Sequence, residues 1–424
     1  MHLPNQVRAL INALRVQGIG GFLGVMSEKR RKQERYERML QDVPVNDHKA
    51  ELRDRTIGKI AIADTTRQAI LNRADAMLRD ENFYFTFPYR LRGLERPFNY
   101  DPQEGLYWPV RHYTEQKLHD EDTPHDVKIV WEINRFKDLP TLAQAAYLTH
   151  EKKYADEVEW RLLRWIDDDP FANSINWASG LELGIRLLSW TASIELLRTA
   201  GFDLSTNAKI ARSIYEQAAY LRAELSTDKI VRSNHLIGEA AGLFATASLW
   251  KYHDAEEHAN TARAILESEI IRQTYEDGAT RESTTWYHGF VTDFFDIAAR
   301  IADGFDKPFS TQYRDRSAAM KIFRESMVQP DGTPVRIGDA DDGWVLYFEG
   351  GNEAWFDALF GPSKVSSFRT KSFEISHYGA IVSGESALFI RGGEFGMGGN
   401  GSSSHAHDDL LAPVIWLSGV PVLV

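Results

Sequence analysis

The spacing of apolar residues predicts a long helical region. From about residue 131 to 327, apolar positions recur every three or four residues, which is the period of an amphipathic helix. The segments with this period are 138–150, 153–166, 179–199, 207–224, 235–250, 255–274, 284–302 and 310–327. Their links are short and contain Gly, Pro, Asp or Asn, so successive helices should lie antiparallel. The pattern predicts a ring of helical hairpins, an incomplete α/α toroid.

The apolar spacing changes after about residue 330, where Pro330-Asp331-Gly332 has turn chemistry. Short strand-like segments follow at 335–338, 344–348, 372–376, 379–383, 387–391 and 411–417. We therefore predict that the C-terminal part is all-β and antiparallel. The chain stops inside the apolar run 420–424. Because natural sheets protect their edges, we expect this chain to be shorter than a complete member of its kind.

The first 130 residues have a weaker pattern. Residues 1–40 have helical spacing, broken near 18–21, and 65–80 are weakly helical. The stretch 83–130 is rich in proline and aromatic residues, which predicts an irregular arm laid over a larger body. The predicted domains are an N-terminal helical and irregular arm at 1–130, the toroid at 131–328 and the strand-rich domain at 329–424.

Composition excludes several classes of protein. The 424 residues contain no cysteine, so disulfides, a thiol nucleophile and Cys-ligated metals are excluded. No apolar run approaches the ~20 residues of a membrane span, and no signal-peptide pattern is present. The net charge of −12 argues against general nucleic-acid binding. The basic run 29–32 fits a solvated helix face, or contact with a membrane surface or an acidic polymer.

Aromatic residues are abundant, with 11 Trp, 16 Tyr and 22 Phe. They fit large helical cores or a carbohydrate cleft, because sugar rings stack on flat aromatic faces. Asn176-Trp177 precedes Glu182, Arg186 and Trp190, and the last three are four residues apart on one helix face. This group is either a surface ion pair or the wall of a sugar cleft.

Ser233-Asn234-His235 and Glu239 form a second polar cluster. Ser233 or Asn234 could cap the helix that follows. Alternatively, the amide of Asn234 and the imidazole of His235 could donate hydrogen bonds to a carboxylate. His235 and Glu239 are four residues apart and share a helix face.

Two further clusters contain histidine. Trp286-Tyr287-His288 begins another predicted helix, and its Tyr is either a buried aromatic or a general acid–base. His405 and His407 follow a Gly- and Ser-rich segment. In a strand they would point the same way as half of a metal site, whereas the alternative is a polar turn.

Together these segments resemble the heparinase II/III-like polysaccharide lyases, which include alginate and oligoalginate lyases. The resemblance lies in WEINRFKDLPTLAQAAY (131–147), NWASGLELGIRLLSW (176–190), SNHLIGEAAGLF (233–244), DGATRESTTWYHGF (277–290), DGTPVRIGDADDG (331–343) and GGNGSSSHAHDDLL (398–411). It covers about residues 130–424. The family fold, an incomplete α/α toroid followed by an antiparallel β-sandwich, agrees with the change of period near residue 330.

The resemblance implies β-elimination of a uronate-containing acidic polysaccharide or oligosaccharide. Removal of the proton α to the uronate carboxylate gives an enolate-like dianion that must be stabilised as it forms. Family members place an Asn and a His on the carboxylate side, which match Asn234 and His235. A Tyr, matched by Tyr287, is the acid and in syn elimination also the base. A His of the sandwich domain, matched by His405, completes the site.

Further residues are expected to bind substrate, and one to bind metal. The expected substrate contacts are Arg135, Asn176, Trp177, Glu182, Arg186, Glu239 and His288. Arg135 and Arg186 would supply the positive charge that an acidic chain needs. No cofactor is required for catalysis. The family's structural zinc is bound by a His that matches His407 and by ligands in later strands, so zinc is expected only in a longer chain.

Two other functions stay open. A glycoside hydrolase would need two carboxylates across a cleft, such as Glu182 or Glu239 with Asp277 or Glu282. A non-catalytic polysaccharide-binding or assembly protein would bind the polymer without forming an unsaturated product. The family implies a periplasmic or secreted protein, although the lack of a signal peptide leaves the cytoplasm open. The sequence sets no oligomeric state.

Overall fold

A computed structural model describes residues 49–423 except 56, 58–59, 85–86, 117–125, 229–232, 341–343, 363–371 and 394–404. These residues belong to one compact unit, Lys49–Val424. The helix predicted over 1–40 and the basic run 29–32 lie outside the described residues. In the described ranges, no helix combines the length and the apolar character needed to cross a membrane.

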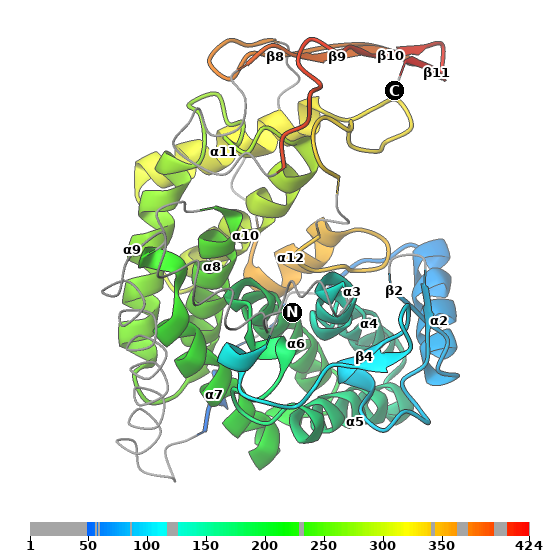
Figure 1. The fold of residues 1–424 in the computed structure, drawn as a ribbon, viewed down its shortest axis with the longest axis vertical. Helices are drawn as coiled ribbons and strands as arrows, with labels where there is room; N and C mark the ends of the chain where they lie inside the picture. The colour runs from blue at the N-terminus through cyan, green and yellow to red at the C-terminus, as the bar shows by residue number, and fades with distance from the viewer. Residues whose placement is uncertain are drawn as a thin grey trace, which may run out of the picture. The chain divides into compact units, whose positions relative to one another are not determined.

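The predicted helices between 138 and 327 are all present, with ends within two residues of those expected (Figure 1). They are α4 (Leu139–Thr149), α5 (Lys152–Asp168), α6 (Gly180–Thr199), α7 (Ala208–Glu224), α8 (Asn234–Leu249), α9 (Ala255–Arg272), α10 (Thr285–Gly304) and α11 (Thr311–Ser326). Neighbouring even-numbered helices pack against one another from α4 to α10, and each packs against the odd-numbered helix that follows it. The result is the predicted incomplete α/α toroid. Helices α6 and α8 are buried on nearly every side, as expected for an inner layer.

Glycines allow α6 and α8 to approach closely. A Cβ added to Gly242 would lie 2.4 Å from Gly184 Cα, and one added to Gly184 would lie 2.5 Å from Gly238 O. Only a residue without a side chain fits such a backbone contact. Because consecutive helices are antiparallel, α4, α6, α8 and α10 run in the same direction. Their N-terminal ends, where most of the candidate residues lie, therefore meet at one end of the ring.

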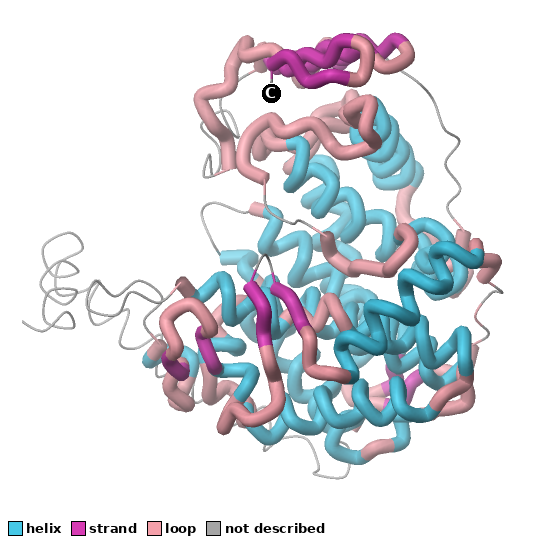
Figure 2. The backbone as a smooth tube through the Cα atoms, turned by 90° about the vertical axis from the view of Figure 1, so that its right-hand side faces the viewer, coloured by secondary structure: helices cyan, strands magenta, loops and turns pink. Residues whose placement is uncertain are grey.

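The arm before the toroid consists of short elements. They are β1 (Glu51–Leu52), α2 (Asp64–Leu78), β2 (Asn82–Tyr84), β3 (Phe87–Tyr89), β4 (Tyr100–Asp101), β5 (Leu106–Tyr107) and α3 (Val127–Asn134). β1 pairs with β6 (Trp250–Lys251), β2 with β3 and β4 with β5 (Figure 2). α2 packs on α4. Trp165 of α5 donates from Nε1 to Oδ1 of the buried Asn134 at 2.7 Å. The arm is therefore fixed against the toroid.

The strands predicted at 335–338 and 344–348 are wrong, and so is an all-β C-terminal part. Neither segment forms a strand, and α12 (Asn352–Phe360) follows them. Side chains bond the backbone groups that a neighbouring strand would otherwise pair. Phe348 N–H donates to Asn352 Oδ1, and Glu349 N–H donates to Gln144 Oε1. The domain boundary at 328/329 stays a prediction, and α12, which lies beyond it, contacts α6 and α10.

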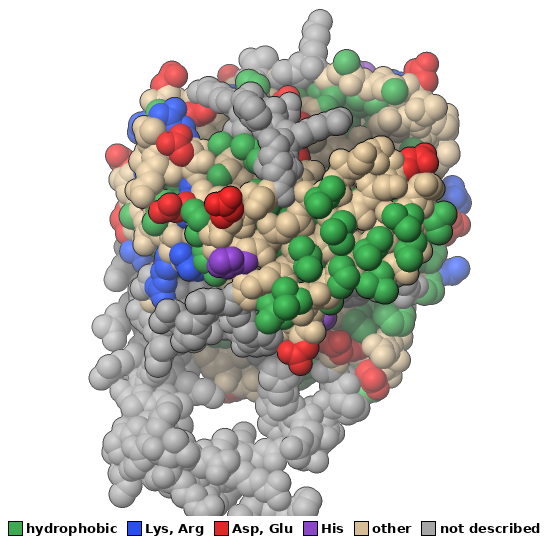
Figure 3. All heavy atoms as spheres, turned by 90° about the horizontal axis from the view of Figure 1, so that it is seen from above, with side chains coloured by type: hydrophobic (Ala, Val, Ile, Leu, Met, Phe, Trp, Pro, Cys, Tyr) green, Lys and Arg blue, Asp and Glu red, His purple; other side chains and the backbone are tan. Residues whose placement is uncertain are grey.

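The four remaining predicted strands and a fifth strand in the apolar run 420–424 form one antiparallel sheet in the order β11-β10-β9-β8-β7. Their bounds are β7 (Ser372–Phe373), β8 (Tyr378–Ser383), β9 (Ser386–Arg391), β10 (Val414–Leu417) and β11 (Val420–Leu423). One face packs Phe389 and Trp416 into a cluster with Phe323 and Met327 at the end of α11. The opposite face exposes apolar side chains (Figure 3). Among the residues of β8, Ile381 is 66% exposed.

Candidate functional site

The start of α8 is held by a carboxylate from the loop before α10. Glu282 accepts from Asn234 N–H at 2.9 Å and from Asn234 Nδ2 at 2.8 Å, and both residues are buried. Ser233 makes no side-chain cap. The helix start therefore takes its acceptor from a residue 48 positions along the chain, and the same bond orients the side chain of Asn234.

Thr284 performs a similar role at the start of α10. Its Oγ1 accepts from Tyr287 N–H at 3.5 Å and donates to Asp339 O at 2.7 Å. Thr285 N–H donates to Ile337 O at 3.0 Å. These bonds fix the segment that ends at Asp339 against the turn of α10 that carries Tyr287.

His405 packs into this corner. Its ring stacks on that of Tyr287, with centroids 3.8 Å apart and planes 22° from parallel. His405 O accepts from Asp339 N–H at 2.7 Å, and His405 Nδ1 lies 3.2 Å from Asp339 Oδ2. Tyr287, His405 and Asp339 therefore form one contiguous group from three separate segments.

The loop that carries His405 is tied down beyond the histidine as well. Asp409 accepts from Gly338 N–H and, at 3.3 Å, from Nη1 of the buried Arg391 in β9. Gly338 has a φ of +74°, and a Cβ there would lie 2.8 Å from Ser283 O and 3.0 Å from His405 O. Only glycine fits this close contact between the segments.

The Asp339 carboxylate determines the form of the His405 ring. A carboxylate can only accept hydrogen bonds, so we assign the proton to His405 Nδ1. In the neutral ring the other nitrogen, Nε2, is then an acceptor. The stacked Tyr287 ring carries a phenol hydroxyl, which can donate a proton. This corner can therefore both accept and deliver a proton.

The four residues predicted to be catalytic are placed as follows. Tyr287 and His405 are in ring contact. Asn234 is joined to the same region through Glu282, which is two residues before Thr284. His235 follows Asn234 on α8 and is half-buried.

Arg135, a predicted substrate contact, is paired inside the protein, and its role in substrate binding stays a prediction. It is buried, and Glu182 accepts from its Nε at 2.6 Å and from its Nη2 at 3.0 Å. Glu132 accepts from its Nη1 at 2.8 Å. Both Arg135 and Glu182 are therefore occupied by an internal ion pair, because a buried charge is stable only when it is paired.

The predicted sugar-cleft wall is part of the core. Arg186 and Trp190 are fully buried, and the Arg186 guanidinium carbon lies 4.3 Å from the ring centroid of Trp165. Burial lowers the pKa of Arg186, and its Nε donates to Gln217 Oε1 at 2.7 Å. Trp177 lies in the same aromatic cluster, 6.0 Å from Trp165 between ring centroids.

The predicted substrate contacts Asn176, Glu239 and His288 also have internal partners. Asn176 Nδ2 donates to Asp169 Oδ1, and Glu239 accepts from both N–H and Oγ of Ser226. His288 is buried between α10 and α11 with Nε2 2.9 Å from Met320 O. Burial lowers the pKa of His288 to about 3. All three side chains bridge buried elements of the toroid, and their role in substrate binding stays a prediction.

His407 does not lie on a strand directed into a sandwich. It is exposed, in the loop before β10. Its neighbour Asp409 is already bonded to Arg391 and Gly338. In the part of the chain that the structure describes, no three His, Asp or Glu side chains gather where a metal ion could sit. The described residues therefore do not fit the zinc site of the family.

Sequence reasoning missed three residues of the site. Glu282 was considered only as a hydrolase carboxylate, and its role at Asn234 depends on a contact 48 residues away. Asp339 lies in the family-like segment 331–343, but no sequence pattern indicates its contact with His405. Arg336 is exposed, and its guanidinium carbon lies 5.7 Å from the ring centroid of Trp286. Arg336 therefore brings positive charge to Trp286, the residue before Tyr287, whereas Arg135 and Arg186 are buried.

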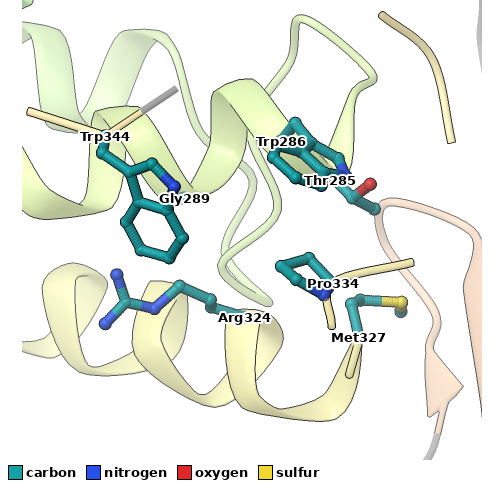
Figure 4. A pocket seen from close by; sticks show the side chains of 7 residues that line it. All are labelled: Thr285, Trp286, Gly289, Arg324, Met327, Pro334 and Trp344. Atoms are coloured by element: carbon teal, nitrogen blue, oxygen red, sulfur yellow. The ribbon is translucent and has the colours of Figure 1, made fainter. Parts of the chain in front are cut away.

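A small hollow lies beside the start of α10. Thr285, Trp286, Arg324 and Trp344 are among its lining residues, and its volume is about 40 Å³ (Figure 4). That space suits about one water molecule. A sugar ring does not fit in it.

Known proteins resemble this chain in sequence and in fold. The family model for the heparinase II/III N-terminus matches residues 32–347. The heparin-sulfate lyase of Pedobacter heparinus is 27% identical over 229 residues, which cover 52% of this chain and 34% of that protein. The chain thus spans about a third of the length of this curated relative.

Solved structures share the fold. A crystal structure of heparinase III has a TM-score of 0.54 at 16% identity, over 97% of this chain and 66% of that chain. A heparinase III gene product has a TM-score of 0.50 at 19% identity, over 99% of this chain and 65% of that chain. The helical toroid, the sheet and the family match agree with one another, and the chain belongs to the heparinase II/III family.

Proposed function

We propose that this chain is part of a polysaccharide lyase that cleaves a uronate-containing acidic polysaccharide by β-elimination. The observation that carries the proposal is the Tyr287–His405–Asp339 group. It combines a proton acceptor, a proton donor and a carboxylate that orients the acceptor. Family membership and the name of the Pedobacter relative support the choice of reaction.

In the proposed step, His405 Nε2 takes the proton from C5 of the uronate. The C5–H electron pair becomes the C4–C5 double bond, and the C4–O bond of the glycosidic linkage breaks. Tyr287 gives its phenol proton to the leaving oxygen. Because the two rings are stacked, the base and the acid can reach C5 and the leaving oxygen of the same linkage.

The carboxylate of the uronate must be stabilised while C5 loses its proton. Asn234 has a second Nδ2 hydrogen beyond the one given to Glu282, and His235 is the next residue. The exposed Arg336 adds positive charge near Tyr287. Preorganised donors of this kind stabilise charge that develops in the transition state.

The carboxylates of the glycoside-hydrolase alternative have other roles in this structure. Glu182 pairs with Arg135, Glu239 accepts from Ser226 and Glu282 accepts from Asn234, and all three are buried. Asp277 accepts from the backbone N–H groups of residues 375 and 376. Two solvent-facing carboxylates across a cleft are what a hydrolase needs, so these contacts favour the lyase.

The test is a lyase assay on heparan sulfate, alginate and hyaluronan, followed by the ultraviolet absorbance of the C4–C5 double bond. Tyr287→Phe should remove at least about 99% of turnover, since general acid–base catalysis contributes ~10²–10⁴-fold, and should leave binding intact. Tyr147→Phe, on α4, is the matched control. Wild-type turnover in Tyr287→Phe would refute the proposed role. Binding without unsaturated product in the wild type would favour a non-catalytic polysaccharide-binding protein.

A further inference from the structure

A larger pocket lies at the N-terminal end of α4, beside the arm. Its volume is about 300 Å³, and it is lined by residues of α2, β2, the start of α4 and the loop before α12. Small-molecule pockets in proteins have volumes of ~300–1,000 Å³. The pocket is therefore large enough for one sugar ring, unlike the hollow beside α10.

Three aromatic rings line this pocket while remaining open to solvent. Phe83 is 53% exposed, Trp344 40% and Tyr347 42%. Most aromatic residues of this chain are buried, so exposure of three of them at one pocket needs an explanation. A pyranose presents C–H groups on its flat faces and hydroxyls around its edge, which suits an aromatic surface rimmed by polar groups.

The loop that carries two of these rings is held in place without a ligand. Glu349 N–H donates to Gln144 Oε1 at 3.1 Å, and Gln144 Nε2 donates to Glu349 O at 3.2 Å. Asn352 Nδ2 donates to Leu346 O at 2.8 Å. A preformed pocket of this kind loses little conformational entropy when a ligand binds.

The charged groups of the pocket largely neutralise one another. Lys137 Nζ lies 2.8 Å from Glu132 Oε1, and both residues are buried. Asp138 Oδ2 accepts from Tyr84 OH at 2.8 Å and pairs with Arg161. Arg73 and Glu349 also line the pocket, so its lining carries two cations and three carboxylates. The pocket therefore offers hydrogen-bond donors and acceptors without the excess of positive charge that a uronate or a sulfate requires.

Asp138 also has an unused acceptor. Its side chain is 9% exposed, and its Oδ1 has no hydrogen-bond partner among the described residues. Buried carboxylate oxygens normally have partners. Because Oδ1 has less than 1 Å² of accessible surface, a ligand in the pocket does not reach it, and the subsite rests on the exposed rings.

Trp344 connects this pocket to the candidate active site. It lines the pocket and also the small hollow beside Trp286, which immediately precedes Tyr287 (Figure 4). The starts of α4 and α10 lie at the same end of the ring. One polysaccharide chain that followed this end could occupy both places.

We propose that the pocket lined by Phe83, Trp344 and Tyr347 is a binding subsite for an uncharged, hydroxyl-rich pyranose unit. On this view the chain recognises a polymer in which uncharged sugars accompany the uronates. The binding step itself does not depend on the elimination chemistry proposed above, whereas the link to a uronate polymer rests on it.

Isothermal titration calorimetry of the full chain with uncharged oligosaccharides tests the proposal. The probes are N-acetylchitotriose, cellotriose and xylotriose, with galacturonate trisaccharide as the charged comparison. At least one uncharged probe should bind, and Trp344→Ala should weaken it about tenfold, as expected for the loss of one stacked ring. Tyr347→Ala should weaken it in the same direction. Phe305→Ala, which removes an exposed ring outside the pocket, should leave it unchanged.

The outcomes separate this inference from the proposed function. If the wild type binds none of the uncharged probes, the inference is overturned. It is also overturned if Trp344→Ala binds an uncharged probe as tightly as the wild type does. A preference for galacturonate trisaccharide that depends on Trp344 would also overturn it. If the lyase assay gives no unsaturated product but an uncharged probe binds in a way that depends on Trp344, the lyase proposal fails and the subsite stands.

Discussion

Glu282 holds together two helix starts of the candidate site, so its replacement by alanine should affect both stability and activity. The carboxylate accepts from Asn234 N–H and from Asn234 Nδ2, at 2.9 and 2.8 Å. Glu282 and Asn234 are 3% and 1% exposed, so water cannot replace the lost acceptor. Glu282→Ala would leave two buried donors without partners.

The size of the effect follows from these two bonds. A buried donor without an acceptor costs about 1–3 kcal/mol, so we expect Glu282→Ala to lose about 2–6 kcal/mol of unfolding free energy. A negative charge near the N-terminus of α8 adds a smaller contribution of ~0.3–1 kcal/mol. Glu282→Gln keeps one acceptor oxygen and should lose about half as much. Turnover should fall in both variants, because Asn234 loses its orientation.

Urea unfolding followed by tryptophan fluorescence measures the loss, and the lyase assay measures turnover. The control is Glu276→Ala, because Glu276 is exposed and lies in the same link between α9 and α10. Its unfolding free energy should stay within about 0.5 kcal/mol of the wild-type value. If Glu282→Ala unfolds at the same urea concentration as Glu276→Ala, the two hydrogen bonds do not hold the start of α8, and the reasoning is wrong.

Two further predictions concern titrating groups. Asp339→Asn should lower kcat without changing substrate Kd, because Asp339 fixes the orientation of the His405 ring, and an unaltered kcat would contradict this positioning role. Burial lowers the pKa of His288 to about 3, below the ordinary value of about 6.5. Between about pH 6.5 and pH 3, His288 is therefore neutral in the folded chain and protonated in the unfolded chain. The contribution of neutral His288 to folding stability is complete above about pH 6.5 and is lost as pH falls toward 3. His288→Gln should reduce the difference in unfolding free energy between pH 7 and pH 4, and an equal difference in both proteins would count against burial as the cause.

Local pattern predicted the elements well where apolar spacing ran over several turns. Helices α4 to α11 begin and end within two residues of the predicted segments, because a helix must repeat its buried face every 3.6 residues. The pattern failed at 344–348, where Val345, Leu346 and Phe348 are buried and side chains bond the backbone. Short apolar runs do not distinguish a strand from a packed loop, because the backbone partners lie elsewhere in the sequence.

The candidate site was predicted in part. Asn234, His235, Tyr287 and His405 were identified through the family resemblance, and the stacking of Tyr287 on His405 is a property of the fold. The substrate role given to Arg186 came from its spacing beside Glu182 and Trp190. The sequence cannot show that Gln217, 31 residues away, is the partner of that guanidinium.

The sequence by itself determined the order of the helices from α4 to α11, the strands beyond residue 370, the change of period near residue 330 and the polar clusters at the helix starts. Only the tertiary structure decided which of those polar residues face solvent and which bridge buried elements. The physical reason is that secondary structure follows from neighbours three or four positions away, whereas the partner of a buried charge is set by long-range packing. Glu182 meets Arg135 from 47 residues away, and His405 meets Asp339 from 66.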